Sequence, residues 1–376
     1  MTNIKILLTG GGTAGHINPA IAIGNYIKEH QPTAQFLFVG TRNGLETSLV
    51  PQNGYDIEYI DIRGFERKIS LRNLKNLFKI VKSCRAVKRI IKDFAPNVII
   101  GTGGYVSGPV LYMGAKLKIP TIIHESNAHP GLTSKILSKY STITALAFAD
   151  TDGNFSKAKR IEVVGNPIRP EILKTDRDAA RRELVLDERP LVLAFGGSLG
   201  AAAINYAVVD MLTESKEQQT DNKEAMPFQL LFATGKNYYQ SIVNQLKLRN
   251  IDIENSCDIR VVEYIYDMNV ALAAADLVIC RSGAATVSEL CACGKASILI
   301  PSPNVTANHQ EYNARAVESV GGGIVILERD LTGGKLMSEV NNMLDERMFE
   351  NYGESAKKIG ITDATEKMYE LVKELV

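Results

Sequence analysis

The sequence has few cysteines and no long apolar run, and both shortages limit the classes of protein it can belong to. Its five cysteines are scattered without a Cys-x-x-Cys pair, which favours reduced cytoplasmic thiols over a disulfide framework or a zinc site. No stretch reaches 18 apolar residues, and Gly10–Gly12 interrupts the apolar N-terminus before it is long enough for a signal peptide. Any membrane contact is therefore expected to be peripheral.

An excess of one charge is also missing. The chain has 43 Lys and Arg against 42 Asp and Glu, so its net charge is only +1 and no general attraction to nucleic acid is expected. Its 376 residues, 45% of them hydrophobic, exceed the size at which a single core stops growing. Two globular domains are therefore expected.

Short, continuous apolar runs alternate with helical patterns along the chain. The runs in the first half are residues 4–8, 36–39, 57–60, 98–100 and 121–123. The pattern then starts again with residues 191–195, 230–233, 259–262, 277–280, 297–300 and 323–327. Runs of this length between helices predict parallel strands that are buried on both faces of a sheet.

Each half begins with a strand, a glycine-rich loop and a helix, which predicts two doubly wound, Rossmann-like α/β domains facing each other across a cleft. Two prolines stiffen residues 165–170, so we place the first domain at 1–165 and the second at 166–363. A last helix, 364–376, is expected to pack back on the first domain. The polar segment 213–225 is expected to be an exposed loop.

The first glycine-rich loop, Gly10 to Gly15, has the G-x-G-x-x-G spacing between a strand and a helix predicted from Pro19. Such a loop brings backbone amides close to a phosphate or sugar, although a turn used only for packing would look the same. The second strand ends without the acidic residue that would hold a dinucleotide ribose, which disfavours nicotinamide binding. His16 follows the loop and could accept a proton near neutral pH, or could be purely structural.

Residues 281–290 follow another predicted strand and are rich in small side chains. They resemble a helix start whose amides could hold a diphosphate, with Glu289 in reach of ribose hydroxyls. The alternative is a capped helix with a surface glutamate. Asp150 and Asp152 have the spacing of a metal-binding pair, but this pattern often arises by chance. Because no strong ligand cluster is present, neither a metal nor another cofactor is expected.

Residues 63–92 contain eleven Lys or Arg and one acidic residue, Glu66, with apolar residues at spacings of three and four. This pattern predicts a basic amphipathic helix. Its charges could simply face water, or they could also attract anionic lipid head groups or a substrate diphosphate.

Seven segments, in this order and spacing, resemble the MurG family over nearly the whole chain. They are residues 11–20, 103–109, 124–133, 165–169, 196–201, 281–289 and 308–314. The resemblance implies a glycosyltransferase-B fold and transfer of N-acetylglucosamine from UDP-N-acetylglucosamine to lipid I, an undecaprenyl-diphosphate-linked muramoyl peptide. The sugar would join the 4-hydroxyl of the muramoyl unit with inversion, giving lipid II for peptidoglycan. The family works peripherally, at the cytoplasmic face of the cell membrane.

The same resemblance assigns roles to individual residues. On the acceptor side it implies His16 as the base, with Tyr105 and Glu125 nearby and Glu125 as the next candidate. On the donor side, the resemblance implies that the sugar is contacted by Thr13, Ala14, Gly15, Asn127 and Gln310. It implies that Arg169 and Ser198 lie beside the diphosphate and uridine region and that Ile265 packs near the uracil. The nucleotide would be bound by the helix start Ala284, Ala285, Thr286, Val287, Ser288 and Glu289, with Glu289 on the ribose.

Ala14, Ser126 and His129-Pro130 depart from the commonest family pattern, which we expect to affect acceptor preference more than donor binding. Three other functions stay open. A UDP-N-acetylglucosamine 2-epimerase would share the fold, a diacylglycerol glycosyltransferase would share the chemistry, and a nucleotide-sugar sensor would bind without catalysis.

Overall fold

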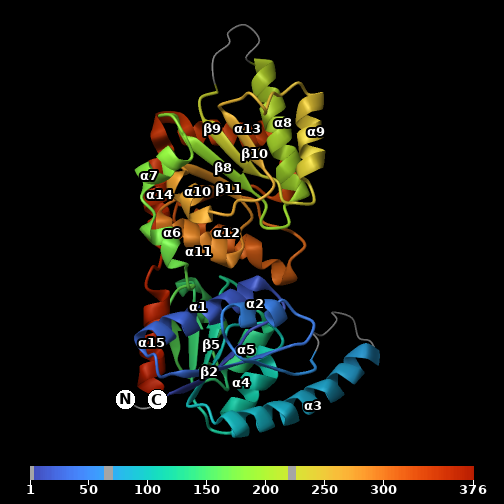
Figure 1. Cartoon of the computed structure of the whole chain (residues 1–376), viewed down its shortest axis with the longest axis vertical. Coiled ribbons are helices and arrows are strands. Elements are labelled where there is room, and N and C mark those ends of the chain that lie inside the picture. Colours follow the sequence, from blue (N-terminus) through green and yellow to red (C-terminus); the bar gives the residue numbers. More distant parts are fainter. Residues whose placement is uncertain (1–3, 63–70, 219–225) are drawn as a thin grey trace. The chain divides into compact units, whose positions relative to one another are not determined.

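The computed structural model describes residues 4–62, 71–218 and 226–376. The chain divides into two compact units, which we call the first and second domains (Figure 1). The first domain comprises Met1–Ile168 and Thr362–Val376, and the second comprises Arg169–Ile361.

The first domain is built on a seven-stranded sheet in the order β3-β2-β1-β4-β5-β6-β7, in which every pairing is parallel. Its strands are β1 (Lys5–Thr9), β2 (Gln35–Gly40), β3 (Ile57–Tyr59), β4 (Val98–Gly101), β5 (Thr121–Glu125), β6 (Ile143–Leu146) and β7 (Ile161–Val163). Successive residues of β1 point to opposite faces, so that Ile6 and Leu8 enter one core and Leu7 enters the other.

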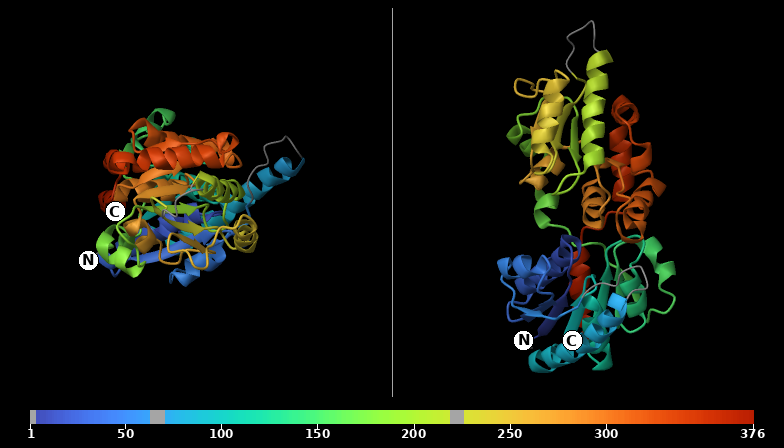
Figure 2. Two further views of the ribbon diagram at one scale, coloured as in Figure 1. Left: turned by 90° about the horizontal axis from the view of Figure 1, so that it is seen from above. Right: turned by 90° about the vertical axis from the view of Figure 1, so that its right-hand side faces the viewer.

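Helices cover both faces of this sheet (Figure 2). The core around Ile6 and Leu8 receives side chains from α1 (Ala14–His30), α2 (Glu46–Gln52) and α15 (Ala364–Leu375). The core around Leu7 receives them from α3 (Leu71–Phe94), α4 (Ser107–Lys116) and α5 (Leu132–Ser138). A 3-10 helix, η1 (Ala149–Asn154), follows β6.

The second domain repeats this architecture on a six-stranded parallel sheet in the order β10-β9-β8-β11-β12-β13. Its strands are β8 (Leu191–Phe195), β9 (Gln229–Ala233), β10 (Ile259–Val262), β11 (Leu277–Cys280), β12 (Ala296–Leu299) and β13 (Gly323–Val325). Its helices are α6 (Pro170–Lys174), α7 (Arg177–Glu183), α8 (Ala202–Gln218), α9 (Tyr239–Leu248), α10 (Met268–Ala274), α11 (Ala284–Cys293), η2 (Thr306–Asn308), α12 (His309–Ser319), η3 (Glu328–Asp330), α13 (Gly333–Leu344), η4 (Asp345–Arg347) and α14 (Met348–Lys357).

The predicted fold class is confirmed, and each predicted strand is present to within two residues at either end. Strands β6 and β7 were not predicted, because β6 mixes Thr and Ala with its two large apolar residues and β7 is only three residues long. Residues 213–218 are helical, and the expected loop there is wrong over those six residues.

The predicted start of the first helix is also wrong, because α1 begins at Ala14 and contains Pro19. A proline at this position removes the one N–H that would bond to the carbonyl of Gly15. Since the helix continues, it tolerates this loss, and Ala14, Gly15 and His16 form its first turn.

The basic region lies partly outside the described residues, which exclude 63–70 and the side chains of 71–79. Over the rest of α3, Val87 and Ile91 are buried in the core while Lys82, Arg85, Lys88, Arg89 and Lys92 are exposed, so this part of the helix is amphipathic as predicted. In the described ranges, no helix combines the length and the apolar character needed to cross a bilayer.

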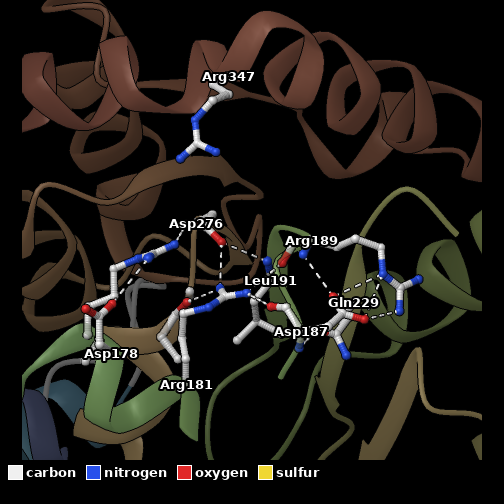
Figure 3. A network of polar contacts seen from close by, with 12 residues as sticks. Asp178, Arg181, Asp187, Arg189, Leu191, Gln229, Asp276 and Arg347 are labelled. Carbon is white, nitrogen blue, oxygen red and sulfur yellow. Dashed lines mark hydrogen bonds and ion pairs between the residues drawn. The ribbon is translucent and has the colours of Figure 1, made fainter. Parts of the chain in front are cut away.

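A network of ion pairs lies at the amino ends of the strands in the second domain (Figure 3). Asp276 directly precedes β11, and its side chain is only 5% exposed. Its carboxylate accepts hydrogen bonds from Arg177 at 2.7 Å, from Arg181 at 3.1 Å and from the backbone N–H of Leu191 at 2.8 Å. The network therefore joins α7 to the starts of β8 and β11.

We expect Asp276→Ala to lower the free energy of unfolding of the protein by about 3–5 kcal/mol, because it leaves the largely buried Arg181 without its carboxylate partner. Asp178→Ala is the matched control, since Asp178 is 76% exposed and lies 3.9 Å from Arg177. Its effect should stay within about 0.5 kcal/mol. Urea unfolding of both variants measures the difference, and equal losses would show that the buried network contributes no special stability.

Candidate active site

The strand order identifies one switch point in each sheet, where ligands of doubly wound folds bind at the carboxyl ends of the strands. In the first domain the order reverses between β1 and β4, and in the second between β8 and β11. The loop after β1 leads into Thr13–His16, and the loop after β4 contains Tyr105. The loop after β8 contains Ser198, and the loop after β11 leads into α11. Most of the predicted site residues therefore lie at these two points.

The two loops of the first domain touch through their backbones. Gly104 has φ +76°, and a Cβ atom there would overlap the carbonyl oxygen of Gly11. A Cβ on Gly103 would lie 2.6 Å from the ring of His16. Any larger residue at these positions would push the β4 loop away from the glycine turn and the imidazole.

His16 is half-buried in the first turn of α1, and its imidazole faces the glycine turn. Its Nδ1 lies 3.2 Å from the carbonyl oxygen of Gly11 and 3.3 Å from Oγ1 of Thr13. A carbonyl oxygen can only accept, so Nδ1 must carry the proton in the neutral ring, and the Thr13 hydroxyl can rotate to accept as well. This assignment places the basic lone pair of the ring on Nε2.

Glu46 is a buried carboxylate beneath the glycine turn that the sequence did not reveal. It accepts hydrogen bonds from the backbone N–H of Gly12 at 3.2 Å and from the N–H and hydroxyl of Thr41 at 2.9 and 2.6 Å. Burial by itself would raise the pKa of Glu46, but the hydrogen bonds outweigh burial and hold the pKa below its usual value. The only signal in the sequence is an acidic residue at a helix start near apolar residues.

Glu125 ends β5 and is 5% exposed. Its carboxylate accepts hydrogen bonds from the backbone N–H of Asn127 at 3.0 Å, from the Asn127 side chain at 3.0 Å and from the N–H of Gly131 at 3.1 Å. The contacts orient Asn127 and hold the loop that follows β5. The two carboxylate oxygens of Glu125 are therefore both engaged by donors of the same loop.

Two predicted site residues of the second domain meet although 120 positions separate them in the sequence. Arg169 caps α6, and its guanidinium lies 3.3 Å from the carboxylate of Glu289 on α11. The Glu289 side chain is 15% exposed and that of Arg169 56%. Burial raises the pKa of Glu289, and the neighbouring Arg169 partly offsets the increase.

The start of α11 is held against α12, which carries Gln310. Ser282 is fully buried, and its hydroxyl donates to the carbonyl of Gln310 at 2.8 Å. The side-chain oxygen of Gln310 accepts from the N–H of Ser302 at 2.9 Å. The N-cap of α11 is Gly283, which has no side chain to cap the first turn. These contacts gather Arg169, Gln310 and the residues 284–289 in one region.

The remaining predicted residues of the second domain are more dispersed. Ser198 is exposed in the β8 loop, next to the switch point. Val287 is fully buried in the core, so only its backbone could face a ligand. Ile265 is half-buried in the loop between β10 and α10, and α10 contacts α11.

Asp150 and Asp152 are exposed on η1, so the predicted metal pair is solvent-facing. Among the residues that the structure describes, no three His, Cys, Asp or Glu side chains are grouped so that they could hold a metal ion.

Two parallel sheets with glycine-rich turns at their switch points are shared by nucleotide-sugar enzymes with paired Rossmann-like domains, and comparison with known proteins identifies this chain as one of the glycosyltransferases among them. The model of the glycosyltransferase family 28 N-terminal domain matches residues 6–146, and that of the family 28 C-terminal domain matches residues 191–375. A relative from Acetivibrio thermocellus is 45% identical over 99% of this chain and 98% of its own. Its name is UDP-N-acetylglucosamine–N-acetylmuramyl-(pentapeptide) pyrophosphoryl-undecaprenol N-acetylglucosamine transferase.

A relative of the same name from Ruminiclostridium cellulolyticum is 44% identical over 99% of this chain and 100% of its own. Among solved structures, MurG from Acinetobacter baumannii is 25% identical, with a TM-score of 0.80 over 99% of both chains. The chain therefore belongs to glycosyltransferase family 28 and, within it, to the MurG family. A UDP-N-acetylglucosamine 2-epimerase from Neisseria meningitidis is 13% identical, with a TM-score of 0.67 over 99% of this chain and 100% of its own, and shares the fold alone.

We expect Glu289→Ala to raise the KM for the UDP-sugar about tenfold to a hundredfold, because a charged hydrogen bond to ribose contributes roughly 1.5–3 kcal/mol. The wild-type KM should also rise as the pH falls through the raised pKa of Glu289, since the protonated acid accepts less well. This dependence should be absent in Glu289→Gln. Glu171→Ala, at an exposed carboxylate two residues from Arg169, is the control. A donor KM unaffected by loss of Glu289 would remove this residue from the site.

Proposed function

We propose that this protein transfers N-acetylglucosamine from UDP-N-acetylglucosamine to the 4-hydroxyl of the muramoyl sugar of lipid I, which produces lipid II for peptidoglycan synthesis. The observation that carries the proposal is the 45% identity, over nearly the full length of both chains, with a relative whose name states this transfer. The geometry of the first domain adds support, because the imidazole of His16 lies beside a glycine turn and its contact with Gly11 leaves Nε2 as the basic nitrogen.

In the proposed reaction His16 Nε2 takes the proton of the acceptor hydroxyl. The hydroxyl oxygen forms a bond to the first carbon of N-acetylglucosamine as the bond from that carbon to the diphosphate breaks, with inversion. UDP leaves with the electron pair. Arg169 and the amide end of α11 stabilise the charge that develops on the diphosphate.

The proposal assigns the acceptor and the membrane to the first domain and the UDP-sugar to the second. The exposed basic residues of α3 support peripheral binding to anionic lipid at the cytoplasmic face of the membrane, since each basic residue near such a surface contributes about 1 kcal/mol. Co-sedimentation with anionic vesicles at low and high salt tests this part of the proposal. Binding should weaken at high salt, and equal binding at both salt concentrations would contradict it.

We expect the purified protein to release UDP from UDP-N-acetylglucosamine with lipid I as acceptor, and to be far slower with diacylglycerol. Without an acceptor it should form no epimer of the donor. The same rate should persist in a chelator, because the proposed diphosphate contacts come from Arg169 and helix amides. Coupled UDP assays and product chromatography measure all three. Epimer formation would favour the epimerase, preference for diacylglycerol the other transferase, and binding without turnover a sensor.

We expect His16→Ala to lower kcat roughly a hundredfold to ten-thousandfold with little change in the donor KM, because a positioned general base contributes about this much. The acid limb of the wild-type pH–rate profile should disappear in the variant. A loss of donor affinity or of thermal stability that accounts for the lower rate would instead indicate a structural role, in which the imidazole holds the glycine-rich loop in place. If kcat stays near the wild-type value, Glu125 is the next base to test.

A further inference from the structure

Glu46 and His16 contact opposite ends of the same peptide group. The carboxylate of Glu46 accepts from the N–H of Gly12 at 3.2 Å, and Nδ1 of His16 lies 3.2 Å from the carbonyl oxygen of Gly11. These two backbone atoms belong to the single peptide unit that joins Gly11 to Gly12. A continuous chain of hydrogen bonds therefore runs from a buried carboxylate on α2, through one planar amide, to the imidazole on α1.

Such a chain is electrostatically cooperative. A carboxylate that accepts from a peptide N–H draws positive charge toward the nitrogen and increases the negative charge on the carbonyl oxygen of that unit. The oxygen then becomes a stronger acceptor for Nδ1–H, most of all when the ring is protonated. Glu46 is held below its usual pKa, so it stays ionised over the range in which a histidine titrates.

We propose that Glu46 is a positioning residue for His16, which it orients and makes more basic through the Gly11–Gly12 peptide. The proposal rests on the base role of His16 stated above. The imidazole keeps its Nδ1 proton toward Gly11 while Nε2 takes the acceptor proton, and the charge of the resulting imidazolium is balanced by Glu46. The peptide thus takes the place that a directly bonded carboxylate has in a catalytic triad.

The structure also explains why the carboxylate is held still. One of its oxygens accepts both donors of Thr41, at 2.9 and 2.6 Å, and the other faces Gly12. Tyr105 also lies at the turn, with its ring 3.7 Å from the Cβ position of Gly12. Farther along α1, Tyr26 and His30 lie beside Tyr369 of α15, at the opposite end of the helix.

The wild-type protein provides the first test, with no variant that could fail to fold. Nitrogen-15 NMR of the His16 ring should show a proton on Nδ1 and none on Nε2 in the neutral form. The opposite tautomer would overturn the proposal outright, because Nδ1 could not then donate to Gly11.

Two variants of the carboxylate site provide the second test. Glu46→Gln removes the charge, and its amide directs N–H groups at Gly12 or Thr41, so we expect the His16 pKa measured by NMR to fall by about 0.5 to 1. We expect kcat to fall about tenfold at neutral pH, with the donor KM little changed. Thr41→Val is the matched control, since it removes one hydrogen bond to the same carboxylate but keeps the charge. Its effect on the His16 pKa should be clearly smaller.

The outcomes distinguish the proposed effect of Glu46 on His16, which we call the relay, from the base role of His16. An unshifted His16 pKa in folded Glu46→Gln would overturn the relay. Equal pKa shifts in Glu46→Gln and Thr41→Val would overturn it too, because packing rather than charge would then be the cause. A lowered pKa with unchanged kcat would support the relay and contradict the base role of His16. Thermal unfolding of each variant identifies any loss that comes from the fold alone.

Discussion

The close approach of main chain to main chain at the carboxyl edges of the sheets is the constraint on which both candidate sites depend. In the first domain the turn after β4 lies directly on the turn after β1, with Gly104 against the carbonyl of Gly11. In the second domain Gly200, after β8, lies against the Thr234 carbonyl that follows β9. A side chain at either glycine would separate the two turns, and repacking neighbouring side chains could not restore the contact.

The fold was largely predictable because its strands are continuous apolar runs, and such runs have few other uses in a chain of this length. The strands that escaped prediction, β6 and β7, are short or of mixed composition, so their pairing depends on the sheet already being in place. The early start of α1 also escaped prediction, since Pro19 suggests a helix boundary although α1 begins at Ala14 and buries Ile17, Pro19 and Ala20.

The sequence identified candidate site residues where they lie within one loop or helix start, as from Thr13 to His16 and from Ala284 to Glu289, and their roles stay predictions. It could not identify contacts between residues that are far apart in the chain. Glu46 reaches Gly12 from 34 positions away and Arg169 reaches Glu289 from 120, and both contacts depend on how the strands order themselves in the sheet. The spacing of residues within one segment does not reveal the order of the strands in the sheet. A sequence pattern can therefore identify a glycine turn without identifying the carboxylate beneath it.

The ion pair between Arg169 and Glu289 has a consequence for the proposed donor site. Glu289 is 15% exposed and Arg169 is 56% exposed, so loss of the pair costs the carboxylate more than the guanidinium. If Arg169 binds the diphosphate and Glu289 the ribose, as proposed, a free diphosphate would remove the partner of Glu289 without replacing it, whereas the whole nucleoside diphosphate would supply ribose hydroxyls that donate to the carboxylate. The pair would then favour the intact nucleotide over a free diphosphate.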